Sequence, residues 1–278
     1  MDIPKIPIAT WIEALESWMD TNAGPLFDGI KLVIGSTVNG LADGFNFVPP
    51  LLLILIFTAI SYLIGKYKIA IFTLLGLLLV LNLGYWEHTM ETLALVLTAS
   101  FIAIVLGVPT GILCARNNGV QKIVTPILDF MQTMPAFVYL LPTLAFFSLG
   151  VVPGVIASVI FAIPPTIRLT NLGIRQVPKD LVEAADAFGS TPMQKLIKLQ
   201  LPIAVPTIMA GVNQTIMLSL SMVVIASMIG AQGVGADVYR AVTQTKTGIG
   251  FEAGLAVVVL AIILDRLTQS LVKTKKKG

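Results

Sequence analysis

An all-α integral membrane protein is the fold class that the sequence predicts. Of its 278 residues, 56% are hydrophobic and only 12% are charged, and the mean hydropathy is +0.90. A soluble domain of ordinary composition carries about twice that share of charged residues. The apolar residues gather in runs close to the roughly 20 residues that a helix needs to cross a bilayer. We therefore expect a bundle of membrane-spanning helices.

Seven apolar runs are expected to cross the membrane. At a rise of about 1.5 Å per residue, helices of this length fit a hydrocarbon layer about 30 Å thick. The boundary between the fourth and fifth runs, at Gly150, is the least distinct. Together the runs form a predicted transmembrane domain, residues 48–271. They cover residues 48–64, 69–86, 92–114, 131–149, 151–169, 205–230 and 252–271.

The basic residues predict which side of the membrane each loop faces. With seven spans, loops 65–68, 115–130 and 168–204 share one side with the end of the chain from Arg266 onward, and this side holds 14 of the 18 Lys and Arg residues. Loops rich in Lys and Arg stay in the cytoplasm. We therefore expect an external N-terminus and a basic cytoplasmic tail, residues 272–278. This distribution accounts for the net charge of +3 without a nucleic-acid partner.

Residues 1–47 are expected to form an external amphipathic segment. Trp11, Leu15 and Trp18 recur at helical spacing, with acidic residues on the opposite face. Such a helix lies at the membrane interface with its tryptophans among the lipid headgroups. A second amphipathic stretch follows a predicted break at Gly24–Pro25. An ordinary packed helix in a small external domain is the alternative.

The composition argues against several kinds of chemistry. With one cysteine and one histidine in the sequence, neither an internal disulfide nor a cluster of thiolate or imidazole metal ligands can form. No phosphate-binding loop of the form G-x-x-x-x-G-K-[ST] occurs. We therefore expect a non-catalytic chain that binds no metal, nucleotide or other cofactor itself.

A polar stretch, residues 178–204, interrupts the apolar runs and predicts a helical hairpin. Asp180 can cap its first helix, and Glu183, three residues later, can complete a capping box. Gly189 can end this helix in the left-handed conformation that glycine adopts without steric cost. The first helix is thus expected to stop directly before a tight turn.

The second helix of the hairpin is predicted to start at once. Thr191 supplies a cap, Pro192 suits the first helical position, and Gln194 completes another capping box. We expect this helix to end at Pro202. Helices of about ten residues are marginal alone in water. Either a groove in a cytoplasmic partner or the protein's own spans must therefore hold the hairpin.

The hairpin resembles the EAA loop of ATP-binding cassette importer membrane subunits. That motif reads EAA-x3-G-x9-I-x-L-P, and the sequence departs from it only by a leucine in place of isoleucine. The resemblance implies a multi-span type I importer permease bundle whose cytoplasmic coupling-helix hairpin docks into an ATPase subunit. The residues that match, and that we assign to ATPase coupling, are Glu183, Ala184, Ala185, Gly189, Leu199, Leu201 and Pro202.

Two further stretches narrow the resemblance. MQTMPAFVYLLP, residues 131–142, and FAIPPTIRLT, residues 161–170, look like the permeases of importers for glycine betaine and related osmoprotectants. The resemblance implies a prokaryotic cell-membrane complex: a homodimer of this chain, two ATP-binding cassette subunits that use ATP and Mg, and an external substrate-binding protein. An autonomous ion-coupled secondary transporter or channel is the alternative function.

Polar residues and prolines within the spans are the candidates for the translocation path. An acid near membrane depth is costly unless it faces protein or water, although Asp129 could instead pair with Arg168 or Arg175. Prolines free backbone groups, which are tolerated where they line a cavity. For the aromatic and the sixth-span candidates, core packing or a dimer seam is the alternative. The candidates are Asp129, Gln132, Pro135, Tyr139, Asn213, Gln214 and Ser221.

Overall fold

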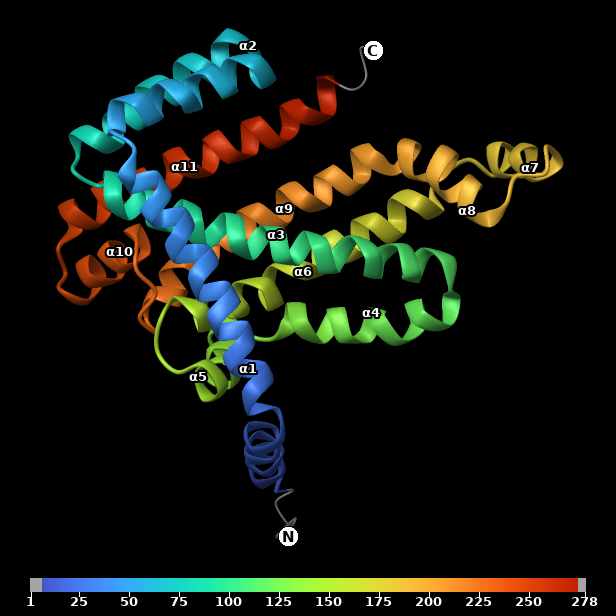
Figure 1. Cartoon of the computed structure of the whole chain (residues 1–278), viewed down its shortest axis with the longest axis horizontal. Helices are drawn as coiled ribbons and strands as arrows, with labels where there is room; N and C mark the ends of the chain where they lie inside the picture. The colour runs from blue at the N-terminus through green and yellow to red at the C-terminus, as the bar shows by residue number, and fades with distance from the viewer. Residues whose placement is uncertain (1–6, 275–278) are drawn as a thin grey trace.

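A computed structural model of the chain describes residues 7–274, and every regular element in this part is a helix (Figure 1). Four long helices form the centre: α3 (Trp86–Arg116), α6 (Val151–Arg175), α9 (Leu201–Ser227) and α11 (Thr247–Thr274). α6 packs against both α3 and α9, and α9 also packs against α11. The prediction of an all-α bundle is confirmed.

Small residues allow the central helices to approach closely. A Cβ atom added at Gly111 of α3 would lie 2.7 Å from the Ile167 carbonyl oxygen of α6, and one added at Gly211 of α9 would lie 3.1 Å from that of Pro165. Across the contact between α6 and α9, the buried hydroxyls of Thr166 and Thr215 share a hydrogen bond of 2.7 Å. Membrane helices associate through such close packing and interhelical hydrogen bonds because lipid provides no hydrophobic driving force.

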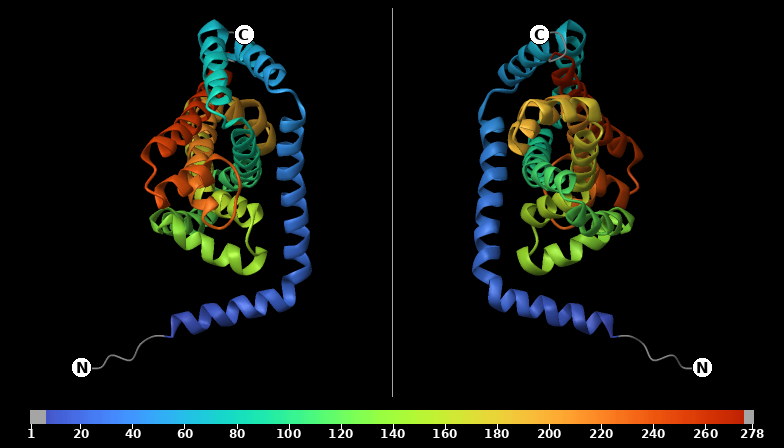
Figure 2. Two further views of the ribbon diagram at one scale, coloured as in Figure 1. Left: turned by 90° about the vertical axis from the view of Figure 1, so that its left-hand side faces the viewer. Right: turned by 90° about the vertical axis from the view of Figure 1, so that its right-hand side faces the viewer.

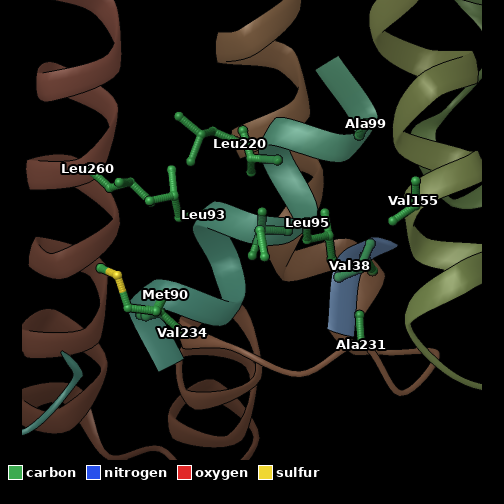
Figure 3. Packing of buried hydrophobic residues seen from close by; sticks show 14 of the residues in the cluster. Val38, Met90, Leu93, Leu95, Ala99, Val155, Leu220, Ala231, Val234 and Leu260 are labelled. Carbon is green, nitrogen blue, oxygen red and sulfur yellow. The ribbon is translucent and has the colours of Figure 1, made fainter. Parts of the chain in front are cut away.

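A buried apolar cluster joins the central helices (Figure 3). Its members extend from α3 toward α6, α9, α11 and the first helix, and their side chains are almost fully excluded from the surface. The cluster therefore fixes the bundle at the end away from the hairpin. Figure 3 labels Val38, Met90, Leu93, Leu95, Ala99, Val155, Leu220, Ala231, Val234 and Leu260.

Helix α2 (Pro50–Asn82) folds back on itself at Lys66. Lys66 has φ 63° and ψ −171°, which is not helical. The hydroxyls of Ser61 and Thr73, 12 residues apart, lie 2.9 Å from each other, whereas a straight helix would separate them by about 18 Å. α2 therefore consists of two antiparallel arms that meet at this corner.

The prediction of seven spans is not matched by the helices observed. Within the described residues, five helices are long and apolar enough to cross a membrane when both arms of α2 are counted as one helix, or six if a bent pair counts as one span. The runs 48–64 and 69–86 are the two arms of α2, and each arm covers only about 24 Å at 1.5 Å per residue. The five helices are Pro50–Asn82, Trp86–Arg116, Val151–Arg175, Pro192–Ser227 and Thr247–Leu271.

The predicted run 131–149 is only the second part of a bent pair of helices, whose first part, α4 (Asn118–Thr133), falls largely in the predicted loop 115–130. α4 ends at the start of this run, and a short 3-10 helix, η1 (Ala136–Tyr139), leads into α5 (Leu140–Phe147). The segment Ala136–Phe147 is bent by 110° relative to α4. Pro135 explains this bend, because a proline holds the residue before it in an extended conformation, and Met134 has ψ 136°.

Helix α1 (Ile8–Phe47) continues through Gly24–Pro25, where the sequence predicts a break. Figure 2 shows that α1 bends and that its longer part runs alongside the bundle. Proline inside a helix removes one backbone hydrogen bond and commonly causes such a bend. Beyond Pro25, Ile34 and Val38 are buried and Phe27 stacks on Phe146 at 4.5 Å, whereas Trp11 is 61% exposed.

The two ends of the bundle differ. α7 (Lys179–Ala187) and α8 (Pro192–Lys195) protrude at one end, and α10 (Val234–Thr243) lies at the other (Figure 1). Residues 1–6, at the start of the predicted amphipathic segment, and residues 275–278, in the predicted basic tail, lie outside the described residues.

The close contact between α3 and α6 yields a test of the packing. Gly111→Ala should lower the melting temperature of the purified protein in detergent, with a cost of about 1–3 kcal/mol, because the new methyl group meets a backbone carbonyl that cannot move freely. Gly254→Ala in α11 is the matched control: nothing lies within 4 Å of its added Cβ, and alanine favours a helix by about 1 kcal/mol. Equal melting temperatures for the two variants would contradict this packing.

Candidate coupling hairpin and translocation surface

The hairpin extends from the end of α6 and the beginning of α9, and these two helix ends pack closely against each other. A Cβ atom added at Gly173 would lie 3.0 Å from the Cβ of Thr207 and 3.3 Å from that of Ala204. Ala204 is also buried in a small cluster with Ile174 and Leu196. The two helices therefore touch at the level where the hairpin begins.

The turn of the hairpin confirms the role predicted for Gly189. This residue has φ +73°, and its N–H donates to the Asp186 carbonyl at 2.9 Å, while the Ser190 N–H donates to the Ala185 carbonyl at 3.0 Å. These two bonds are those of a Schellman motif, which ends a helix with glycine in the left-handed conformation. The Lys195 ammonium also lies 2.6 Å from the Asp186 carboxylate and ties the two helices together.

The second predicted capping box is confirmed. The Gln194 side-chain oxygen accepts the Thr191 N–H at 2.9 Å, and the Thr191 hydroxyl accepts the Gln194 N–H at 3.3 Å. The capping box predicted for Asp180 and Glu183 is wrong. α7 begins at Lys179, its cap position is Pro178, and no side chain caps it. Asp180 lies in the first turn instead, where its charge favours the helix dipole.

The second helix does not end at Pro202, contrary to the prediction. A five-residue π-helix, Leu196–Gln200, joins α8 to α9, so that one helical path runs into the membrane bundle. The Leu201 N–H donates five residues back, to the Leu196 carbonyl. Pro202 follows directly in the first turn of α9, where a missing N–H costs least.

The hairpin presents apolar side chains to its surroundings. No residue of α7 is buried, and Phe188 at the tip is 90% exposed. Leu181, Met193 and Ile197 are also exposed. Burying apolar surface contributes about 25 cal/mol per Å², so this tip gains stability when another surface covers it.

The matched motif residues occupy two levels of the hairpin. Glu183 and Ala184 are exposed and Ala185 half-buried on α7, and beside Glu183 lies a depression of about 210 Å³ lined in part by Arg175 and Lys179. The remaining motif residues lie nearer the bundle: Leu199 and Leu201 are half-buried, and Pro202 is exposed.

Asp129 forms an ion pair with Arg168, as one alternative for this residue predicted. The guanidinium Nη2 of Arg168 in α6 lies 2.5 Å from the Asp129 carboxylate in α4. The Asp129 side chain is largely exposed, whereas Arg168 is half-buried. Gln132 and Pro135, further along the same segment, are exposed as well. This part of the candidate path is an open, polar surface.

Tyr139 and Asn213 instead face the protein interior. The Tyr139 hydroxyl donates to the Met131 carbonyl, and its ring packs in a buried cluster that includes Met222. Asn213 donates to the Asp265 carboxylate of α11 at 2.8 Å. Asp265 accepts a second bond from Gln269.

Gln214 and Ser221 lie exposed on the side of α9 away from its contact with α6. The packed face of α9 carries Gly211, Thr215 and Ser219. The seven candidates are therefore not gathered into one site. Five of them lie on open surface of α4, of α9 or of the bend after α4, and the other two hold helices together.

A polar cluster at the opposite end of the bundle was not predicted. The ring Nδ1 of His88 lies 2.5 Å from the buried Asp237 carboxylate, and Arg240 approaches the same group at 3.6 Å. Burial and the nearby carboxylates of Asp237 and Glu252 raise the pKa of the Tyr85 phenol. His88 and Asp237 are 149 residues apart, so no spacing in the sequence could have joined them.

A membrane helical bundle with a protruding helical hairpin between two of its central helices defines a class, the permease subunits of ATP-binding cassette importers. The chain belongs to the family described as the binding-protein-dependent transport system inner membrane component, which matches residues 107–277. The resemblance stated from the hairpin sequence is thereby confirmed, and this family consists of transport subunits embedded in the membrane.

Relatives match nearly the whole chain. The glycine betaine transport system permease protein OpuAB of Bacillus subtilis is 58% identical over 99% of this chain and 98% of its own length. The glycine betaine/carnitine transport permease protein GbuB of Listeria monocytogenes is 55% identical over 99% of each. The glycine betaine/proline betaine transport system permease protein ProW of Escherichia coli is 48% identical over 95% of this chain and 75% of its own.

A solved structure shares the fold. It shows the MetNI methionine ABC transporter in inward-facing conformations, and one of its chains aligns with a TM-score of 0.61 and 22% identity. The alignment covers 66% of this chain and 92% of that chain. The chain therefore has the type I importer permease fold.

Proposed function

We propose that this permease subunit forms the translocation path for glycine betaine or a related quaternary ammonium compound. The names of three relatives that are 48–58% identical to this chain support this substrate class. Such a zwitterion has no net charge, so the membrane potential does no direct work on it. A thousandfold gradient costs about 4 kcal/mol, and another energy source must supply it.

We infer that a separate ATPase supplies this energy and that the hairpin receives it. The sequence has no phosphate-binding loop, so ATP and Mg belong to the partner. The observation that carries the inference is the hairpin itself: an ordered turn, an exposed Phe188 and a base at Gly173 where α6 and α9 touch. A partner that grips the tip would move both helices together.

Two copies of this chain, two ATPase subunits and an external substrate-binding protein complete the proposed complex. A path shared by two identical chains favours twofold symmetry, and the polar surface around Asp129, Gln132, Gln214 and Ser221 is available to line it. Closure of the two ATPases would favour one of two states of the path, provided that ATP binds the two states with different affinity.

We propose that the hairpin end of the bundle is cytoplasmic. The segments that connect the central helices at this end include Arg116, Lys122, Arg175, Lys179 and Lys198, and basic connecting segments stay in the cytoplasm. The end that carries α10 would then face the external binding protein. The N-terminus is assigned to the outside and the C-terminus to the cytoplasm.

The turn at Gly189 provides a test of coupling. Gly189→Val should reduce ATP-driven uptake by about tenfold or more while the complex still assembles, because a β-branched residue at φ +73° costs about 1–3 kcal/mol and distorts the tip. Gly84→Val is the matched control: it has φ +81°, also with nothing within 4 Å of an added Cβ, but lies far from the hairpin. Normal uptake by Gly189→Val, or an equal loss in both variants, would refute the assignment.

The orientation is tested by cysteine labelling in intact cells. Because the native Cys114 is buried, new cysteines can be introduced at the exposed positions Thr21 and Met193. A membrane-impermeant maleimide, applied to cells that make the permease without the proposed ATPase, should label Thr21→Cys from outside and Met193→Cys only after permeabilisation. The reverse pattern would show that the proposed orientation is inverted.

A further inference from the structure

A cavity of about 800 Å³ lies between the corner of α2 and the last turns of α11. Its wall is apolar and includes Ile69, Phe72 and Ile262. In Figure 1 the corner of α2 and the C-terminal end of α11 both point toward the side from which α7 and α8 protrude. The cavity is separate from the hairpin and from the candidate path.

Helix packing gives the cavity the shape of a wedge. At Gly76, α2 touches α11: an added Cβ atom would lie 2.7 Å from a methyl group of Val259. One to three turns further on, toward the hairpin end of the bundle, the space between the same two helices is open. The apolar part of the cavity therefore begins where α2 and α11 touch and opens toward the hairpin end of the bundle.

Three cations surround this opening: Lys66, Lys68 and Arg266. In the part of the chain that the structure describes, neither lysine forms an ion pair, and no acidic residue lines the cavity. The carboxylate nearest to Arg266 is Asp265 at 4.0 Å, and Asp265 already accepts bonds from two amide side chains. The opening thus carries positive charge that the protein itself leaves largely unmatched.

The backbone at Lys66 is strained. Its φ of 63° with ψ of −171° belongs to a region that is essentially restricted to glycine. The sequence nevertheless places a lysine at this corner, directly after Gly65. Strain of this kind is typical of positions that hold a ligand or a functional contact.

We propose that this cavity binds an anionic phospholipid from the leaflet on the hairpin side. Its phosphate would lie among the three cations, and an acyl chain would cover the apolar wall. Basic pockets between membrane helices bind anionic headgroups in this way. The exposed Tyr62 and Tyr67 flank the corner, where tyrosine marks the level of the headgroups. A free phosphate would leave the apolar wall uncovered, so the lipid is the better match.

The proposal predicts selective binding that can be measured without ATP or substrate. The full-length chain in detergent is titrated with phosphatidylglycerol or with phosphatidylcholine, and bound lipid is counted by native mass spectrometry. We expect tighter binding of phosphatidylglycerol, weakened about fivefold for each cation removed and roughly a hundredfold in the triple variant Lys66→Gln, Lys68→Gln, Arg266→Gln. Because no transport is involved, the result is independent of the proposed substrate and partners.

Three controls make the outcome decisive. Lys122→Gln removes a cation from the exposed surface of α4, outside the cavity, and should leave the affinity unchanged. Lys66→Gly relieves the backbone strain, so the protein should fold at least as well but bind about fivefold less lipid. Equal affinity for the two lipids, an equal loss in Lys122→Gln, or full competition by inorganic phosphate at millimolar concentration would each overturn the proposal.

Discussion

The close approach of α6 to α3 and α9 is the constraint on which the rest of the structure depends. Lipid provides no hydrophobic force that would press membrane helices together, so contact requires small residues and satisfied polar groups. Gly111, Gly173 and Gly211 leave room for backbone and side-chain atoms of the neighbouring helix, and Thr166 bonds to Thr215 across one interface. With α6 fixed on two sides, the helices that begin and end at its tips have defined positions.

This arrangement separates a rigid part of the chain from surfaces that remain uncovered. The hairpin begins where α6 ends and continues into α9 without a break, so it extends the best-packed pair of helices. The apolar tip at Phe188, the polar surface around Asp129 and Gln214, and the wedge between α2 and α11 lie outside this packed centre. The fold therefore offers three separate surfaces, which we assign to an ATPase, a transported solute and a lipid.

Local chemistry could be predicted from the sequence where neighbouring residues determine it. The Gly189 turn and the box formed by Thr191 and Gln194 were predicted because each involves residues within a few positions of one another. The α7 start was wrong because Pro178 and Asp180 both suit a helix start, and the sequence does not show which one the chain uses. The end at Pro202 was wrong because a π-helix shifts the hydrogen-bond ladder ahead of the proline.

Features that depend on contacts between distant parts of the chain were harder to predict from the sequence. The apolar runs and the loop predicted at 65–68 located the two arms of α2, but the sequence did not show that these arms are short or that another segment bends by 110°. The sequence left open whether Asp129 lines the path or forms an ion pair, because its partner Arg168 lies 39 residues away. Hydropathy measures how apolar a segment is, whereas the angle of a bend and the partner of a charge depend on the neighbouring helices.

Our central claim is that the exposed tip of the hairpin is covered by an ATPase in the working complex. The most direct measurement is the labelling rate of Phe188→Cys by a water-soluble maleimide, in the permease alone and in the assembled complex, with Thr21→Cys as the reference position. The account predicts that assembly suppresses labelling at position 188 and leaves position 21 unaffected. Equally fast labelling at position 188 in both preparations would contradict it.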